Sequence, residues 1–147
     1  MLSGADGSAG TSGTYVCFGD WPKTIKADGV SVNESKSVQV GANTYYKGSD
    51  GAWYAKQQEK ANGSNYKYSD NTAVAQNSAN SFKYFKVEPI KCRVVTTDYN
   101  GSGKKLLLAE NILINCRYDD NKNNYENSEI RGYLNGDFYN TAFTSDL

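Results

Sequence analysis

The chain has 147 residues, enough for one domain with a buried core. Its 16 Lys plus Arg balance its 16 Asp plus Glu, and this formal net charge of zero argues against a nucleic-acid partner or an anionic membrane surface. The absence of histidine excludes Ser-His-Asp and Cys-His catalysis and every histidine-based zinc or iron site.

The N-terminal third of the chain predicts a leader followed by short strands. Residues 1–13 are rich in Gly, Ser and Ala, which is typical of a flexible leader, and residues 14–147 predict a single α+β domain. A β-like run at 14–18 opens the ordered part. Valines alternate with polar residues over 30–40, so we expect two short strands on either side of residues 33–35.

The clearest local signal is a hairpin near residue 50. Residues 44–47 and 52–55 flank Gly48-Ser49-Asp50-Gly51, which predicts a β-hairpin with a four-residue loop. The stretch 57–81 is polar and aromatic without a firm period, which favours a long loop with room for one short strand near 66–68.

The core is predicted between residues 81 and 116, as two or three adjacent strands. Ile90, Cys92 and Val94 alternate with Lys91 and Arg93, the pattern of a half-buried strand. Two unbroken apolar runs follow at 106–108 and 112–114. Such runs suit strands covered on both faces, although a buried helix fits the same pattern.

Two short helices are expected after these strands. Ser128 is a good N-cap for the first, and Gly136 is placed to end it with a positive φ. The apolar face of this helix would consist of Ile130, Tyr133 and Leu134. Asp137 would cap the second helix, whose apolar face would consist of Phe138, Ala142 and Phe143. Strands followed by helices favour an α+β fold.

The three cysteines lie too far apart in sequence for a CxxC redox or zinc motif. One disulfide with a free thiol, or three buried free cysteines, are both open alternatives for Cys17, Cys92 and Cys116. The alternation around Cys92 predicts that it is buried beneath the helix at 128–135. Its pairing with Cys116 would require neighbouring strands, because a disulfide needs Cα atoms within about 7 Å.

One segment imitates the start of an EF-hand calcium loop. Asp119, Asn121 and Asn123 supply oxygen ligands at alternate positions. The loop also needs glycine at its sixth position and glutamate at its twelfth, and here these hold Asn124 and Ile130. We therefore predict a solvated polar loop and no metal site.

Glu126, Glu129 and Asp137 are candidates for a pair of carboxylates in acid–base catalysis. The sequence shows neither the desolvated pocket nor the neighbouring charge that would shift their pKa values apart. Helix capping and the helix dipole explain Glu129 and Asp137. The sequence thus predicts no catalytic, cofactor-binding or metal-binding residue.

Aromatic residues offer the only recognition signal. The chain has 12 tyrosines, and tyrosine gives large contacts at low entropy cost. The candidates for an aromatic surface that binds carbohydrate or protein are Trp21, Trp53, Tyr45, Tyr46 and Tyr54. Cross-strand packing inside a hairpin is the competing explanation. No apolar run reaches the length of a membrane span.

Three motifs resemble a bacterial domain family of unknown function that is found mostly in exported and surface-anchored proteins. They are FKVEPIKCRVV at 85–95, LLLAENIL at 106–113 and YENSEIRGYLNGDFYNTAF at 125–143. In this family Trp usually stands at the positions that hold Cys92, Tyr125 and Tyr133 here. The family is distantly similar to the formylglycine-generating-enzyme branch of the C-type-lectin-like fold.

The resemblance implies a partial C-type-lectin-like domain, because family members continue with a second half beyond the Ala142-Phe143 motif. It further implies a non-catalytic binding or structural module, extracellular or at the cell surface, with no cofactor. A degenerate or truncated relative of a formylglycine-generating oxidase is the alternative. Without the second half, we expect an exposed apolar face that promotes self-association.

Overall fold

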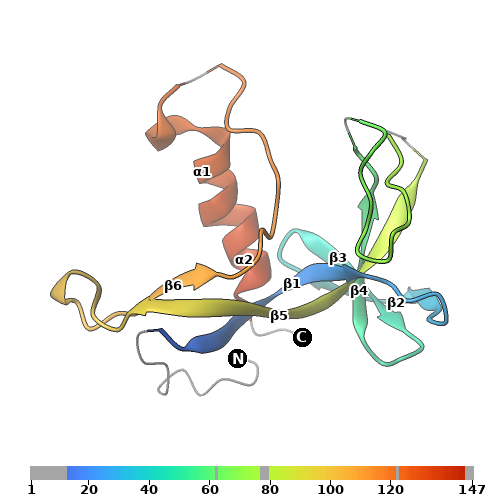
Figure 1. The fold of residues 1–147 in the computed structure, drawn as a ribbon, viewed down its shortest axis with the longest axis horizontal. Coiled ribbons are helices and arrows are strands. Elements are labelled where there is room, and N and C mark those ends of the chain that lie inside the picture. The colour runs from blue at the N-terminus through green and yellow to red at the C-terminus, as the bar shows by residue number, and fades with distance from the viewer. Residues whose placement is uncertain (1–12, 62, 77–79, 122, 145–147) are drawn as a thin grey trace. The chain divides into compact units, whose positions relative to one another are not determined.

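A computed structural model describes residues 13–61, 63–76, 80–121 and 123–144 of the chain. It is a mostly antiparallel β structure with one short helical segment, residues 129–142, near its C-terminal end (Figure 1). This confirms an α+β or β-rich class. The predicted leader lies, apart from Gly13, outside the described residues.

Six strands and five helical turns make up the described structure. The strands are β1 (Tyr15–Ile25), β2 (Val32–Val40), β3 (Asn43–Gly48), β4 (Trp53–Gln58), β5 (Phe82–Thr96) and β6 (Leu106–Ala109). The helical turns are η1 (Tyr99–Gly101), η2 (Tyr125–Asn127), α1 (Glu129–Tyr133), η3 (Leu134–Phe138) and α2 (Tyr139–Ala142). The strand order is β1-β5-β4-β3-β2, and β6 pairs with β5.

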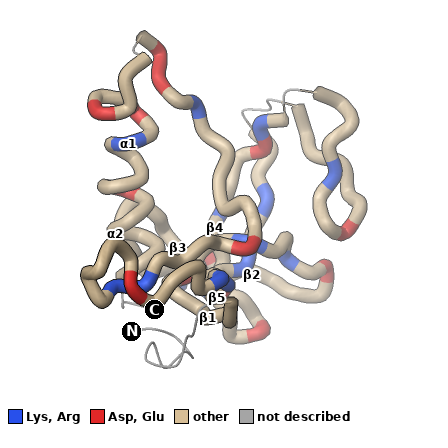
Figure 2. The backbone as a smooth tube through the Cα atoms, turned by 60° about the vertical axis from the view of Figure 1, so that its left-hand side comes forward, with Lys and Arg blue, Asp and Glu red and all other residues tan. Residues whose placement is uncertain are grey.

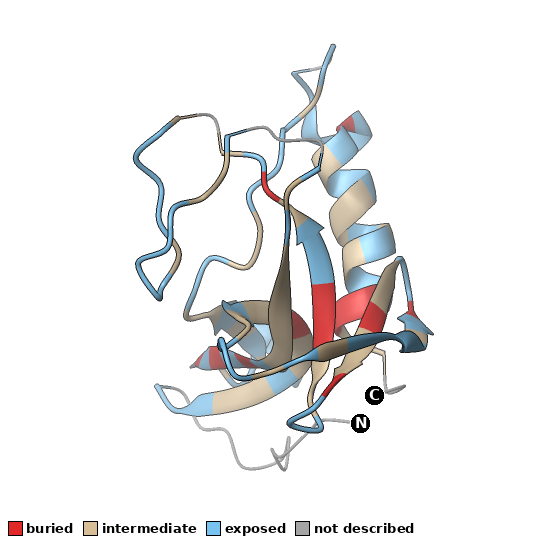
Figure 3. Cartoon of the chain, turned by 90° about the vertical axis from the view of Figure 1, so that its right-hand side faces the viewer, coloured by how far each residue is buried: buried red, intermediate tan, exposed pale blue. Residues whose placement is uncertain are grey.

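The chain forms two compact units. Unit 1 comprises Met1–Trp21 with Pro89–Leu147, and unit 2 comprises Pro22–Glu88. Strands β1 and β5 run through both units, so the prediction of a single domain over residues 14–147 stays a prediction. Buried positions concentrate on the strands and at the end of the helical segment (Figure 3).

Unit 2 contains the predicted hairpin. Strands β3 and β4 pair with Tyr45 opposite Ala55 and Lys47 opposite Trp53, and the Gly48 N–H donates to the Ala52 carbonyl at 2.8 Å. The hairpin is therefore confirmed.

The expectation of two short strands around residues 33–35 is wrong, because β2 is one strand. Its register against β3 shifts between Asn33 and Ser37. This irregularity absorbs the polar residues 34–36 without ending the strand.

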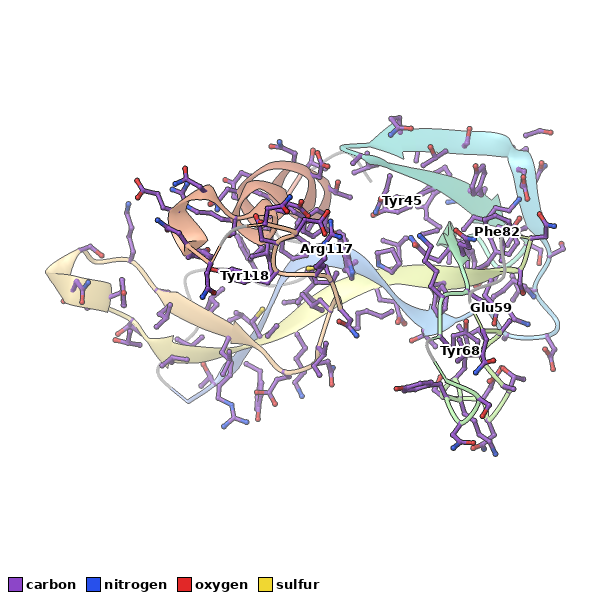
Figure 4. The ribbon with its side chains drawn as sticks, turned by 90° about the horizontal axis from the view of Figure 1, so that it is seen from above. Tyr45, Glu59, Tyr68, Phe82, Arg117 and Tyr118 are labelled. Carbon is purple, nitrogen blue, oxygen red and sulfur yellow. The ribbon has the colours of Figure 1, made fainter. Side chains whose placement is uncertain are left out.

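A buried carboxylate organises the long loop of unit 2. Glu59 is 3% exposed, and it accepts hydrogen bonds from the Tyr68 hydroxyl and the Ala75 N–H, both at 3.0 Å, and from the Ser81 hydroxyl (Figure 4). The predicted strand near 66–68 is reduced to an isolated bridge at Lys67. The loop is thus tied to one acidic side chain instead of to a strand.

In unit 1 the alternation on β5 is confirmed. Ile90, Cys92 and Val94 are all buried, and Ile90 and Cys92 belong to a core cluster with Trp21 and Ala142. Val94 exchanges backbone hydrogen bonds of 2.8 Å with residues 13 and 14, which come just before β1.

The expectation that both apolar runs are strands covered on two faces is wrong. In β6 only Leu107 and Ala109 pack on the core, while Leu106 and Leu108 are exposed. Residues 112–114 form no strand, and Ile112 is 93% exposed. The chain leaves the sheet after Ala109, so strand alternation governs the first run and nothing covers its outer face among the described residues.

The Ser128 cap is confirmed, because its Oγ accepts from the Arg131 N–H at 3.3 Å. The expected helix end at Gly136 is wrong: Gly136 has no positive φ, and the π-helical turn η3 joins α1 to α2. Asp137 lies inside this turn and caps no second helix. The aromatic contacts of Phe138 with Trp21 and with Phe143 hold the widened turn in place, at centroid distances of 4.8 and 5.8 Å.

Candidate binding pocket

Unit 1 contains a pocket of about 670 Å³. Its strand-derived apolar lining consists of Val16, Phe18, Ile90, Leu107 and Ala109. Leu113 from the segment after β6 and Phe138 and Phe143 from the helical segment complete the apolar walls. The volume falls within the roughly 300–1,000 Å³ that is typical of small-molecule sites.

A close approach of β1 to the helical segment shapes one wall. Gly19 has φ +75°, and a Cβ added there would lie 2.5 Å from Cδ1 of Phe143 and closer still to the Ala142 carbonyl. Phe143 stacks on Phe18 with ring centroids 4.8 Å apart. Only glycine allows both this backbone conformation and this contact.

Two thiols line the same pocket. Cys92 is buried, and its Sγ donates to the Ile90 carbonyl at 3.7 Å, while Cys17 on β1 is half-buried. Burial raises the pKa of the Cys92 thiol, and the charge of Cys17 adds to this rise. Cys92 is therefore a protonated thiol at neutral pH, which is a weak nucleophile and a weak metal ligand.

Burial of Cys92 is confirmed, but the part of the helical segment that covers it is not residues 128–135. Cys92 clusters with Trp21 and Ala142, with Phe138 and Phe143 against it. All three cysteines are free, and Cys116 is exposed.

One side of the pocket carries positive charge. Gly103, Lys104 and Lys105, from the connection between η1 and β6, line it together with the apolar side chains. None of the described residues in this lining carries a carboxylate. Over the described chain as a whole, acidic and basic positions are interspersed (Figure 2), so a wall with lysines alone is a local feature.

The opposite face of the same strands carries charged side chains that contact one another, beside the exposed Leu106 and Leu108 of β6. Arg93 on β5 pairs with Glu110 at 2.8 Å, and Arg93 also donates to the Tyr15 hydroxyl at 3.1 Å. Lys91 lies 4.1 Å from the centroid of the Tyr15 ring. These contacts hold Arg93 and Lys91 on the face away from the pocket.

The predicted aromatic surface is wrong, because most of its members are core residues. Trp21, Tyr45 and Tyr54 are 8%, 0% and 2% exposed. Tyr46 pairs with Tyr54 and Trp53 pairs with Lys47, so by strand alternation Tyr46 and Trp53 lie on opposite faces of the hairpin. They cannot form one platform for a sugar ring.

Two partly exposed aromatic side chains of unit 2, Trp53 and Phe82, contact lysine side chains. The Lys47 ammonium lies 4.3 Å from the Trp53 ring centroid, and the Lys56 ammonium lies 5.4 Å from that of Phe82. Lys56 also pairs with Glu34 at 2.8 Å, a contact that lowers the pKa of Glu34. Cation–π contacts and an ion pair thus engage these two aromatic side chains within unit 2.

The segment that imitates an EF-hand serves as a turn. The Asp119 carboxylate accepts from the Asn121 N–H at 2.7 Å and from the Glu129 N–H at 3.0 Å. Arg117 (Figure 4) pairs with Glu129 at 2.9 Å and also with Asp120. In the described residues no three Cys, Asp or Glu side chains gather as a metal site requires.

Sequence reasoning missed the pocket. Its walls come from four separate stretches of chain, and no local pattern links Lys104 and Lys105 to Cys17 or Phe143. The apolar alternation of β5 was the one available signal, and it predicted a covered face without showing that the cover leaves a cavity.

Comparison with known protein families finds a match for one part of the chain. Residues 102–147 match a family described as a domain of unknown function, DUF6273, which is less than half of the chain. No curated protein and no solved structure matches. Within the residues that the structure describes, no helix has the length and apolar character needed to cross a membrane.

Proposed function

We propose that this chain is a non-catalytic binding module that takes an apolar group into the pocket of unit 1. The observation that carries the proposal is an apolar pocket of about 670 Å³ whose walls come from β1, β5, β6 and the helical segment. Burial of an apolar group there is favourable by roughly 25 cal/mol per Å² of surface removed from water.

The lining supports binding over catalysis. It contains no carboxylate, and the raised pKa of Cys92 keeps that thiol protonated. A general acid or base needs a titratable group with a pKa near the working pH, and a nucleophile needs an activating partner. The described lining residues supply neither.

Binding of a hydrophobic dye to the protein and to two variants tests the proposal. We expect the full chain to bind the dye, and Ala109→Phe to weaken binding, because the added ring fills the pocket. The matched control is Leu108→Phe on the outer face of the same strand, where Leu108 is 59% exposed. Urea unfolding checks that both variants fold. Equal dye binding by the two folded variants would contradict the proposal.

The biological setting is also a proposal. The motifs at 85–95 and 125–143 resemble an exported bacterial domain family, distantly similar to the formylglycine-generating branch of the C-type-lectin-like fold. The match of residues 102–147 to a domain of unknown function overlaps the last motif and agrees with the part of the resemblance that names a family of unknown function. From this resemblance we propose that the protein lies outside the cell or at its surface and has a C-type-lectin-like fold. Protease treatment of intact source cells should remove it, and full protection with intact cells would contradict this localisation.

A second candidate function is a degenerate oxidase of the formylglycine-generating type. The observation that favours it is the presence of Cys17 and Cys92 in one pocket. Substrate-peptide oxidation with and without added copper separates the two functions. Turnover above background that disappears in Cys17→Ser would replace the binding proposal with this one.

We also propose that the exposed apolar side chains of unit 1 support association of two copies. Leu106 and Leu108 on β6 are 40% and 59% exposed, and exposed strands with apolar side chains promote pairing. Sedimentation of the full chain over a range of concentrations should show a dimer that Leu108→Lys weakens. A monomer at all concentrations would exclude it.

A further inference from the structure

We propose that the natural ligand of the unit 1 pocket is an alkyl carboxylate, a free fatty acid whose chain lies among the apolar walls and whose carboxylate lies at Lys104 and Lys105. This inference rests on the proposed binding function and specifies the chemistry of the ligand.

The charge of the lining selects an anion. Among the described residues that line the pocket, Lys104 and Lys105 are the only ones with a formal charge at neutral pH, since Cys92 stays protonated and none of them is Asp or Glu. An anionic group at the lysine side therefore finds complementary charge, and a cationic group finds repulsion.

The remaining walls select an alkyl chain over a peptide. Apart from the two lysines, the lining side chains are apolar or thiol. A peptide would bring backbone N–H and C=O groups into the pocket, and each would cost free energy if it found no hydrogen-bond partner. An alkyl chain has no such groups. The only polar group of an alkyl carboxylate is its carboxylate, and this would find its partners at Lys104 and Lys105.

The pocket has a built-in reporter of occupancy. Cys17 lines it and is half-buried, whereas Cys116 is exposed and lies outside the lining. A bound alkyl chain should slow alkylation of Cys17 and leave Cys116 unchanged. The two rates come from the same molecules, so the readout needs no variant that could misfold.

The experiment measures the alkylation rate of each cysteine by N-ethylmaleimide and peptide mass mapping, on the full chain, with ligands of one chain length. These ligands are octanoate, octan-1-ol and octyltrimethylammonium. We expect octanoate to protect Cys17 at concentrations about two- to fivefold lower than octan-1-ol, the range that a solvent-exposed charge pair supplies. The cation should protect least, and added salt should narrow the difference.

Lysine variants then assign the charge. Lys104→Ala and Lys105→Ala should each reduce the preference for octanoate over octan-1-ol, while protection by octan-1-ol stays the same. Lys36→Ala, an exposed lysine of unit 2, is the matched control. Equal protection by octanoate and octan-1-ol in the unaltered chain would overturn the carboxylate inference and leave the binding function standing. Failure of all three ligands to protect Cys17 selectively would overturn the binding function as well.

Discussion

The indole Nε1 of Trp21 donates a hydrogen bond of 3.0 Å to the carbonyl oxygen of Leu113, which is 92 positions later in the chain. This bond joins β1 to the irregular segment that follows β6. The same indole lies 4.8 Å from the Phe138 ring, so one side chain holds both the segment after β6 and the helical segment against the strands. Trp21 therefore holds two walls of the pocket in place, the one with Leu113 and the one with Phe138.

Replacement of Trp21 by Phe should destabilise the protein by about 2–4 kcal/mol. The variant leaves the Leu113 carbonyl without its donor and removes buried volume, and both effects cost free energy. The measurement is urea unfolding monitored by far-UV circular dichroism. Trp53→Phe is the control, because Trp53 is only partly buried and its described polar contact is with Lys47. A loss for Trp53→Phe equal to that for Trp21→Phe would contradict the assignment.

Gly19→Ala should cost about 2–4 kcal/mol and weaken ligand binding. The positive φ of Gly19 strains an alanine, and the new Cβ would meet Phe143 and the Ala142 carbonyl. Gly101→Ala separates these causes, since Gly101 has φ +67° with nothing within 4 Å of an added Cβ. The control should lose about 1 kcal/mol from backbone strain alone. Similar unfolding midpoints for the two variants would show that the close contact is absent in solution.

Glu59→Gln should destabilise unit 2 by about 1–3 kcal/mol at pH 7, because the variant weakens a charged acceptor of three hydrogen bonds. The Ser81 hydroxyl is the main cause of a pKa for Glu59 below 4.5, although burial opposes it. A lowered folded-state pKa gives stability that is present above pH 4.5 and is lost as the pH falls through the folded-state value. The difference between wild type and Glu59→Gln should therefore shrink in acid.

Urea unfolding at several pH values from 7 down to 3 provides this difference. Other carboxyls with lowered pKa values, such as Asp50, contribute the same acid dependence to both proteins and cancel in the comparison. A difference that stays constant down to pH 3 would show that Glu59 is not hydrogen-bonded as an anion.

The three thiols should react in a fixed order with an alkylating reagent. Cys116 is exposed and should react first, Cys17 is half-buried and should follow, and Cys92 should be slowest. Burial both blocks access to Cys92 and raises its pKa, so we expect it to react at least about tenfold more slowly than Cys116. Reaction of Cys92 at the rate of Cys116 in the folded protein would mean that the helical segment does not cover it.

The parts of the fold that the sequence predicted correctly rest on local signals. Gly48 and Gly51 mark the hairpin loop because turn residues act within four positions. Ser128 marks the helix start because a cap bonds to an N–H three residues away. The alternation of Ile90, Cys92 and Val94 shows one buried face because strands have a period of two.

The parts that failed depend on partners far away in the chain. Nothing local to Leu106 and Leu108 shows that their outer face stays exposed, because this depends on where the chain goes after Ala109. Likewise, Tyr45 and Tyr54 have the composition of a recognition surface, and only the packing around the hairpin makes them core residues. The pocket could not be predicted for the same reason, since it exists only where four distant stretches meet.

The π-helical turn Leu134–Phe138 acts as a one-residue insertion in an otherwise α-helical segment. Each residue of an α-helix turns the following side chains by about 100°, so an extra residue resets which direction the last turn faces. Deletion of Gly136 would restore an ordinary helix without changing any side chain of the pocket. It would also rotate Phe138 and Phe143 away from Ile90 and Cys92. The presence of one residue, Gly136, whose surroundings leave room for an added Cβ, therefore determines whether the two rings pack on the strands.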